Sequence, residues 1–258
     1  MTGYGYRLTG PDGSRRLGLI VLQVDETIEQ DFRRLFPAET ALYVTRIASG
    51  AALTPETIAR MEGQLPAAAG LLPPAVEFDA VAYACTSGTT LIGAERVAAL
   101  VKGACRTKTV TDPLTASIAA MRAVGARRIG LVSPYIPSVA EPIRNAFLAA
   151  GFEVPRTGSF GEECEARVAR IDPAAIAEVA RDVARDVAGD VARGMAGGGK
   201  VDALFLSCTN LRTLDVIAGL EAELGRPVLS SNQALAWDMA RRAGAVVSLS
   251  APGRLFQA

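Results

Sequence analysis

Short apolar runs alternate with helix-length segments along most of this chain, and that alternation is the feature that most constrains its fold. Strands that are separated by helices predict a parallel sheet built from right-handed crossover connections. We therefore expect an α/β protein. The predicted strands cover residues 17–22, 41–47, 80–84, 109–111, 129–133, 152–155, 203–207, 228–230 and 246–249.

Two Pro-containing dipeptides mark helix starts between these strands. Thr54-Pro55 predicts a helix over residues 58–65, and Asp172-Pro173 predicts a long Ala-rich helix from Ala174 to about Met195. In both dipeptides a capping side chain precedes a proline, whose fixed φ suits the first turn of a helix.

The two halves of the chain resemble each other. Residues 18–21 are similar to residues 130–133, and residues 112–116 are similar to residues 232–236. The offsets between matching segments are nearly constant, so we expect two pseudo-symmetric domains. We predict one domain from residues 1–115 plus 232–258 and a second from residues 116–231, with the active site in the cleft between them.

A cysteine closes one apolar run in each half. Cys85 follows the run 78–84 and Cys208 follows the run 201–207, and each is followed by a threonine and a polar residue. Open parallel sheets bind ligands at the carboxyl ends of their strands, and a turn there can direct backbone N–H groups towards an anion and favour a thiolate. We therefore expect a thiol pKa somewhat below its usual value of about 8.5. The other two cysteines, Cys105 and Cys164, are expected to be small apolar side chains.

The chain contains no histidine. This absence excludes Ser-His and Cys-His nucleophile pairs and histidine metal sites. A pair of thiols in one cleft could instead act as base and acid on opposite faces of a carbon atom. Cys85 and Cys208 are therefore the predicted catalytic pair.

The composition limits the classes of binding partner and the cellular compartment that we expect for this chain. Lys plus Arg equals Asp plus Glu, at 27 each, so there is no basic stripe for nucleic acid. No run of about 18 uncharged apolar residues predicts a membrane span, and no signal-like segment opens the chain. We expect a cytoplasmic protein with reduced thiols, whose spacing matches no zinc pattern. A small carboxylate is the expected partner, and the sequence leaves open whether the chain forms a homo-oligomer.

Four segments carry a resemblance to a known family: Cys85-Thr86-Ser87-Gly88-Thr89, Cys208-Thr209-Asn210, Ser133-Pro134-Tyr135 and residues 230–237. On these segments the chain resembles the aspartate/glutamate racemase superfamily, in the branch of the maleate cis-trans isomerases and arylmalonate decarboxylases. Residues 18–27 are most similar to the ectoine-utilisation members of that branch.

The resemblance implies the two-domain fold, a cleft site and no metal, flavin, nicotinamide or pyridoxal cofactor. It implies that Cys85 and Cys208 are the catalytic cysteines. It further implies substrate contacts: backbone nests for carboxylates and a tyrosine that reaches the substrate, at Thr86, Ser87, Thr209, Asn210 and Tyr135. Arylmalonate decarboxylases have glycine in place of the first cysteine, so Cys85 opposes that activity.

Two acidic residues depart from the isomerase pattern. Asp25 and Glu165 stand where the isomerases place asparagines near substrate carboxylates. A carboxylate there would repel a dianion such as maleate, whereas it would pair with an amino group on the substrate. The alternatives are that Asp25 caps a helix beginning near Glu26, and that Glu165 lies on a solvated surface.

Three functions follow from these residues. The first is a cofactor-independent racemase or epimerase that uses the two thiols α to a carboxylate, on a diamino acid or an acylated derivative as in ectoine breakdown. The second is a maleate-type cis-trans isomerase that works through a covalent cysteine adduct. The third is a non-catalytic binding protein that retains the cleft.

Overall fold

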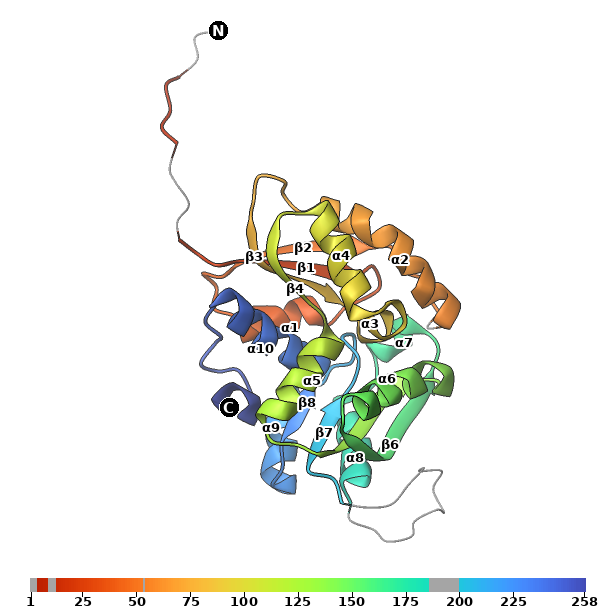
Figure 1. The fold of residues 1–258 in the computed structure, drawn as a ribbon. Coiled ribbons are helices and arrows are strands. Elements are labelled where there is room, and N and C mark those ends of the chain that lie inside the picture. Colours follow the sequence, from red (N-terminus) through yellow and green to blue (C-terminus); the bar gives the residue numbers. More distant parts are fainter. Residues whose placement is uncertain (1–3, 9–12, 53, 186–199) are drawn as a thin grey trace.

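The computed structural model describes residues 4–8, 13–52, 54–185 and 200–258. These residues form two four-stranded sheets, ordered β2-β1-β3-β4 and β6-β5-β7-β8, in which all neighbouring strands are parallel (Figure 1). The predicted α/β class with two parallel sheets is therefore confirmed.

The first sheet consists of β1 (Arg16–Leu22), β2 (Ala41–Ile47), β3 (Phe78–Ala84) and β4 (Thr107–Thr111). Helices α1 (Ile28–Leu35) and α10 (Ser231–Ala243) pack on one face, and α2 (Pro55–Gly70) and α4 (Ala94–Ala104) pack on the other. Because both faces are covered, β3 is buried along its whole length, as its apolar residues 80–84 require.

The second sheet consists of β5 (Arg128–Tyr135), β6 (Glu153–Glu162), β7 (Ala203–Leu206) and β8 (Val228–Ser230). Helix α6 (Pro137–Ala149) packs against β5 and β6, while α8 (Pro173–Ala184) and α9 (Leu214–Leu224) pack together near β7 and β8. The four-residue helix α7 (Glu165–Val168) follows β6, and a short 3-10 helix, η2 (Arg254–Gln257), ends the chain.

The two sheets have the same topology. In each, the first strand lies between the second and the third, and the fourth lies at the edge. Strands β3 and β7 are therefore equivalent, and each leads into one of the two cysteines. This equivalence is the structural counterpart of the internal sequence similarity.

The halves are joined by helices that pack across the junction. Helix α3 (Thr86–Ile92) contacts α6, and α5 (Pro113–Ala123) packs against both α10 and β8. Helix α10 follows β8 but packs against β3 and β4, so the chain returns to the first sheet after Ser230. We keep residues 1–115 plus 232–258 and 116–231 as the proposed domain limits.

The predicted strand at residues 246–249 is wrong. This segment follows Gly244, which ends α10 in the left-handed conformation, and the Ser248 N–H donates to the Leu35 carbonyl at the end of α1. It therefore lies against a helix end rather than a strand edge. The side chains of Val246 and Leu249 are exposed.

Two further predicted elements differ in length. Strand β6 continues to Glu162 instead of ending at residue 155, although its second half is polar. The predicted helix 174–195 is present as α8 from Pro173 to Ala184, capped by Asp172, and its continuation through 186–195 lies outside the described residues. The predicted helix at 58–65 is the central part of α2. Thr54 and Thr57 form a capping box at the N-terminus of this helix.

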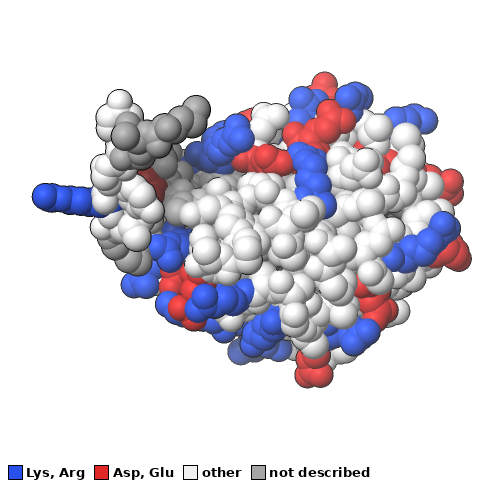
Figure 2. All heavy atoms as spheres, turned by 90° about the horizontal axis from the view of Figure 1, so that it is seen from above, with Lys and Arg blue, Asp and Glu red and all other residues white. Residues whose placement is uncertain are grey.

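Basic and acidic side chains are interspersed around an uncharged area on the face nearest the first sheet (Figure 2). Within the described residues, none of the helices has the length and apolarity needed to cross a bilayer.

Candidate active site

Cys85 lies at the carboxyl end of β3 and caps helix α3. Its Sγ accepts a hydrogen bond from the Gly88 N–H at 3.1 Å and lies 3.6 Å from the Ser87 hydroxyl. A Cβ at Gly88 would lie 2.4 Å from the Tyr83 hydroxyl oxygen and 2.9 Å from the Cys85 sulfur. Glycine is therefore required here, because only its small size lets the backbone N–H approach the thiol.

Cys208 occupies the equivalent position after β7, in a different backbone conformation. Its φ is +119°, and it is the only residue other than glycine with a positive φ in the described part of the chain. Its N–H donates to the Ser231 hydroxyl at 3.0 Å. The Tyr135 hydroxyl and the Asn210 N–H both hydrogen-bond to the thiol and act to lower its pKa.

Hydrogen bonds hold the two cysteine loops side by side. The Thr86 and Ser231 hydroxyls lie 2.9 Å apart, and the Thr209 hydroxyl donates to the Ala84 carbonyl at 3.4 Å. Burial raises the pKa of Tyr135, and the nearby charges of Cys208 and Cys85 raise it further. Tyr135 is therefore close to both sulfurs, and the two thiols belong to one site.

Asp25 uses its two carboxylate oxygens differently. Oδ1 accepts from the N–H groups of Thr27 at 2.8 Å and Ile28 at 2.9 Å, so the capping alternative holds for this oxygen. Oδ2 is buried and makes no hydrogen bond of good geometry among the described residues, although the Thr209 side chain is near enough to Asp25 to act to lower its pKa. One oxygen thus remains available to a substrate.

Glu165 shows the same division. It is only 2% exposed, so the alternative that placed it on a solvated surface is wrong. Oε1 accepts from the Asn210 side-chain amide at 3.1 Å, and Oε2 is buried without a partner in the described structure. Glu165, Cys85 and Ser87 line one narrow cavity.

Burial controls the electrostatics of this site. It raises the pKa of Glu165 from 4.5 to about 7, with a further contribution from Asp25, and it also raises the pKa of Asp25. It raises the pKa of Cys85 to about 11, and it raises that of Cys208 well above its ordinary value, with a further contribution from Glu165. The expectation of a depressed thiol pKa is therefore wrong for the structure as it stands, because desolvation outweighs the N–H donors.

The predicted substrate-binding side chains are not equally available. Asn210 uses its side-chain oxygen to accept from the Glu26 N–H at 2.8 Å and its amide nitrogen to donate to Glu165, so its side chain is engaged within the protein. The Thr86 hydroxyl is engaged by Ser231. The structure brings all nine predicted residues to the junction of the two halves, but it assigns several of them to holding the site together.

Sequence reasoning did not select Gly88 or Ser231 as site residues. Both lie in the segments that carry the family resemblance. Ser231 also follows β8, at the position equivalent to the turn after β4. The similarity between the two halves of the sequence could therefore have indicated Ser231 as a site residue.

The fold and the site together define a class: two-sheet α/β proteins in which the third strand of each sheet delivers one cysteine to a shared, buried site. The family model described as arylmalonate decarboxylase matches residues 17–256, and the chain belongs to that family. It is an enzyme family, and the predicted branch is confirmed. The ectoine-utilisation subgroup stays a prediction.

Individual relatives carry different activities. An arylmalonate decarboxylase from Bordetella bronchiseptica is 36% identical over 149 residues, a match that spans 57% of each chain. A maleate isomerase from Nocardia farcinica is 26% identical over 257 residues, which cover 95% of this chain and 96% of the relative.

Two solved structures resemble this one closely. A liganded variant of arylmalonate decarboxylase, in which one glycine is replaced by cysteine and one cysteine by serine, has a TM-score of 0.79 at 26% identity and covers 94% of this chain and 98% of its own. A cysteine-to-serine variant of the Nocardia farcinica maleate cis-trans isomerase with a covalently bound succinylcysteine intermediate has a TM-score of 0.77 at 26% identity, with the same coverage.

Proposed function

We propose that this protein is a cofactor-independent racemase or epimerase in which Cys85 and Cys208 exchange a proton with the carbon α to a substrate carboxylate. The proposed substrate also carries an amino group, as a diamino acid or its acylated derivative does, including those of ectoine breakdown. One observation carries the proposal: Asp25 Oδ2 and Glu165 Oε2 are buried and accept no hydrogen bond from the residues that the structure describes, and both carboxyl groups are close enough to Cys208 to raise the pKa of its thiol.

An ammonium group would satisfy both of these oxygens. Buried charges are stable only when they are paired, and the carboxylates that repel a second anion would attract a cation. Pairing would also weaken the repulsion by which Glu165 raises the pKa of both thiols. Binding of the amino group would thereby help to form the thiolate that the reaction needs.

In the proposed reaction the two thiols face opposite sides of the α-carbon. One cysteine, as thiolate, takes the α-proton from one face, and the electron pair moves towards the substrate carboxylate. The other cysteine, as thiol, returns its own proton to the opposite face. The hand of the substrate decides which cysteine starts as the base, and product release leaves the roles exchanged.

Solvent isotope exchange tests this proposal. Fully reduced protein would be incubated in heavy water with both enantiomers of a panel of diamino and acylamino acids, and NMR would follow deuterium at the α-carbon. We expect exchange together with inversion for at least one substrate. The absence of exchange across the panel would reject the proposal.

A maleate-type cis-trans isomerase is the second candidate, favoured by the relative that forms a succinylcysteine intermediate. A thiolate would add to one alkene carbon and the π electrons would move towards a carboxylate. The resulting single bond would rotate, and loss of the thiolate would restore the alkene. A succinyl adduct on Cys85 or Cys208 after incubation with maleate, detected by mass spectrometry, would favour this reaction. Failure of maleate to protect either thiol from alkylation would count against it.

A further inference from the structure

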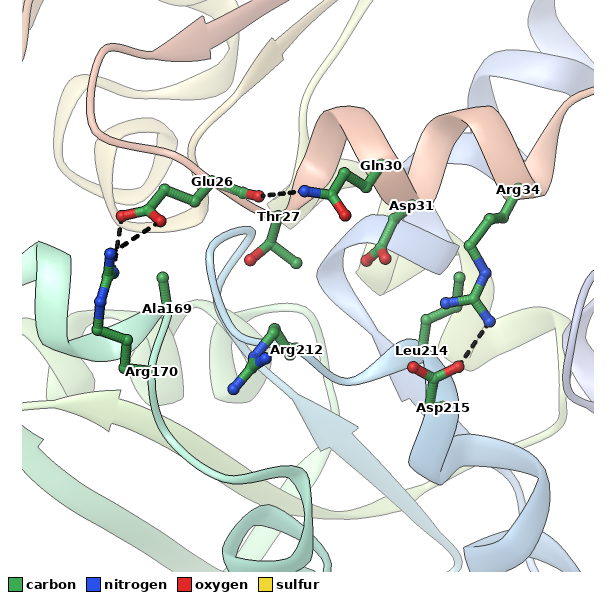
Figure 3. Close-up of a pocket in the computed structure, with 10 residues that line it drawn as sticks. All are labelled: Glu26, Thr27, Gln30, Asp31, Arg34, Ala169, Arg170, Arg212, Leu214 and Asp215. Atoms are coloured by element: carbon green, nitrogen blue, oxygen red, sulfur yellow. Dashed lines mark hydrogen bonds and ion pairs between the residues drawn. The ribbon is translucent and has the colours of Figure 1, made fainter.

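A second pocket lies on the outer side of the loop that follows Cys208. It has a volume of about 450 Å³ and is formed by α1, the segment after α7 and the segment after β7 (Figure 3). Neither catalytic cysteine lines it. Its charged residues are Glu26, Asp31, Arg34, Arg170, Arg212 and Asp215.

Four of these six charges neutralise each other in pairs. Arg34 pairs with Asp215 at 2.6 Å, and Arg170 pairs with Glu26 at 2.7 Å, on opposite sides of the pocket (Figure 3). Arg212 and Asp31 are left over. The pocket therefore has one cation and one anion whose charges its own ion pairs do not neutralise.

Arg212 and Asp31 both point into this space (Figure 3). Arg212 is exposed and makes no hydrogen bond or ion pair within the described part of the chain. Asp31 is 5% exposed, and its Oδ2 accepts from the Asn232 side-chain amide at 2.8 Å. Burial raises the pKa of Asp31 from 3.8 to about 6, which leaves most of it ionised at neutral pH.

We propose that this pocket binds a small zwitterion, with its carboxylate on Arg212 and its ammonium on Asp31. An arginine fork suits a carboxylate, and Asp31, whose Oδ2 is held by Asn232, can offer its other oxygen to an ammonium group. The two flanking ion pairs would exclude a ligand with a large net charge of either sign. An amino acid has the required chemistry.

The pocket wall also supports the catalytic loop. The Asn232 amide that bonds to Asp31 also donates to the Thr209 carbonyl at 2.8 Å. On the same wall, the Thr27 hydroxyl donates to the Asn210 carbonyl at 2.9 Å. Both residues that follow Cys208 are therefore hydrogen-bonded to residues of this pocket wall, and we infer that a ligand in the pocket alters the reactivity of the Cys208 thiol.

Calorimetry or ligand-observed NMR with the full chain tests the site. The probes are glycine, 4-aminobutyrate and 6-aminohexanoate, which span different separations of the two charges, with butyrate and butylamine as singly charged controls. We expect one zwitterion to bind at least about tenfold more tightly than either control, and Arg212→Gln to weaken it by at least about tenfold. Arg33→Gln, an exposed arginine on α1 outside the pocket, should leave binding unchanged.

Two results would overturn the site. One is the absence of saturable binding by all three zwitterions, and the other is equal binding by Arg212→Gln and the wild type. The binding comparison between Arg212→Gln and the wild type does not depend on turnover. A failed racemase assay would therefore leave the proposed zwitterion site standing.

The link to Cys208 has its own measurement. Mass spectrometry would follow iodoacetamide labelling of Cys208 with and without saturating probe. We expect the rate to change by at least about fivefold in the wild type, and to stay constant in Arg212→Gln at the same probe concentration. An unchanged rate in the wild type would overturn the coupling.

Discussion

The hydroxyl groups of Thr86 and Ser231 lie 2.9 Å apart, and through this contact the loop that follows Cys85 holds the segment that supports Cys208. Ser231 also accepts the N–H of Cys208 at 3.0 Å. All three residues are buried, so solvent cannot replace these bonds.

Replacing Ser231 with alanine should destabilise the fold and the site together. The Cys208 N–H would lose its acceptor, and an unsatisfied buried donor costs about 1–3 kcal/mol. Urea unfolding of Ser231→Ala should show this loss, whereas the exposed Ser250→Ala should stay within about 0.5 kcal/mol of wild type. A Ser231→Ala protein as stable as the wild type would show that the contact contributes little.

Substitution should separate the two proposed catalytic thiols from the other cysteines. Under the proposed mechanism Cys85→Ser or Cys208→Ser removes one of the two proton carriers, and racemisation should fall by at least about 10²-fold. The half-buried Cys105 lies outside the site, and Cys105→Ser should keep wild-type rates. Coupled assays of inversion for both enantiomers would measure this. Full inversion by either single variant would contradict the paired roles.

Glu165→Gln should increase thiol reactivity while it weakens binding of an amino-bearing substrate. The charge of Glu165 contributes to the raised pKa of both Cys85 and Cys208, so its removal lowers both pKa values. Iodoacetamide labelling at fixed pH should therefore accelerate, and the KM for the amino substrate should rise. Glu163→Gln changes an exposed neighbour and serves as the matched control.

Stability should fall as pH rises through the titration of Glu165. Its pKa is about 7 in the folded protein and 4.5 as the unperturbed reference, so the folded state binds the proton more tightly. The stabilisation by this proton is complete below pH 4.5 and is lost between pH 4.5 and about pH 7. The shift corresponds to about 3 kcal/mol, and Glu165→Gln should remove most of that slope in unfolding experiments across this range.

The two candidate reactions should respond to this titration in opposite ways. An ammonium substrate needs ionised Glu165, so its KM should fall as pH rises through about 7. A dianionic alkene is repelled by the same ionised group, so its KM should rise over that interval. Steady-state kinetics on whichever substrate turns over would distinguish them. A flat KM profile would show that Glu165 does not contact the substrate.

The sequence predicted most of the sheet framework and the position of both thiols. Cys85 and Cys208 each follow a buried strand, and a parallel sheet places such residues at its ligand-binding edge whatever the details of packing. Strand 246–249 was predicted wrongly because local apolarity cannot reveal that the segment lies against the end of α1.

The electrostatics of the site could not be predicted from the sequence. Glu165 stands in a polar stretch after a long, irregular strand, and its burial depends on Asn210, which is 45 residues away along the chain. The thiol pKa values likewise depend on how completely the two halves close over the site. The residues of the local turn indicate which groups face the sulfur. Desolvation of the thiol depends instead on the packing of the whole folded chain.

Cys208 adopts φ = +119°, and the equivalent residue of the other half, Cys85, adopts a relaxed φ of −148°. A side chain in that first conformation costs about 1–3 kcal/mol, which glycine would avoid. The two equivalent positions thus differ in conformational cost: Cys85 carries its thiol on a relaxed backbone, whereas Cys208 carries its thiol against the preference of its own backbone.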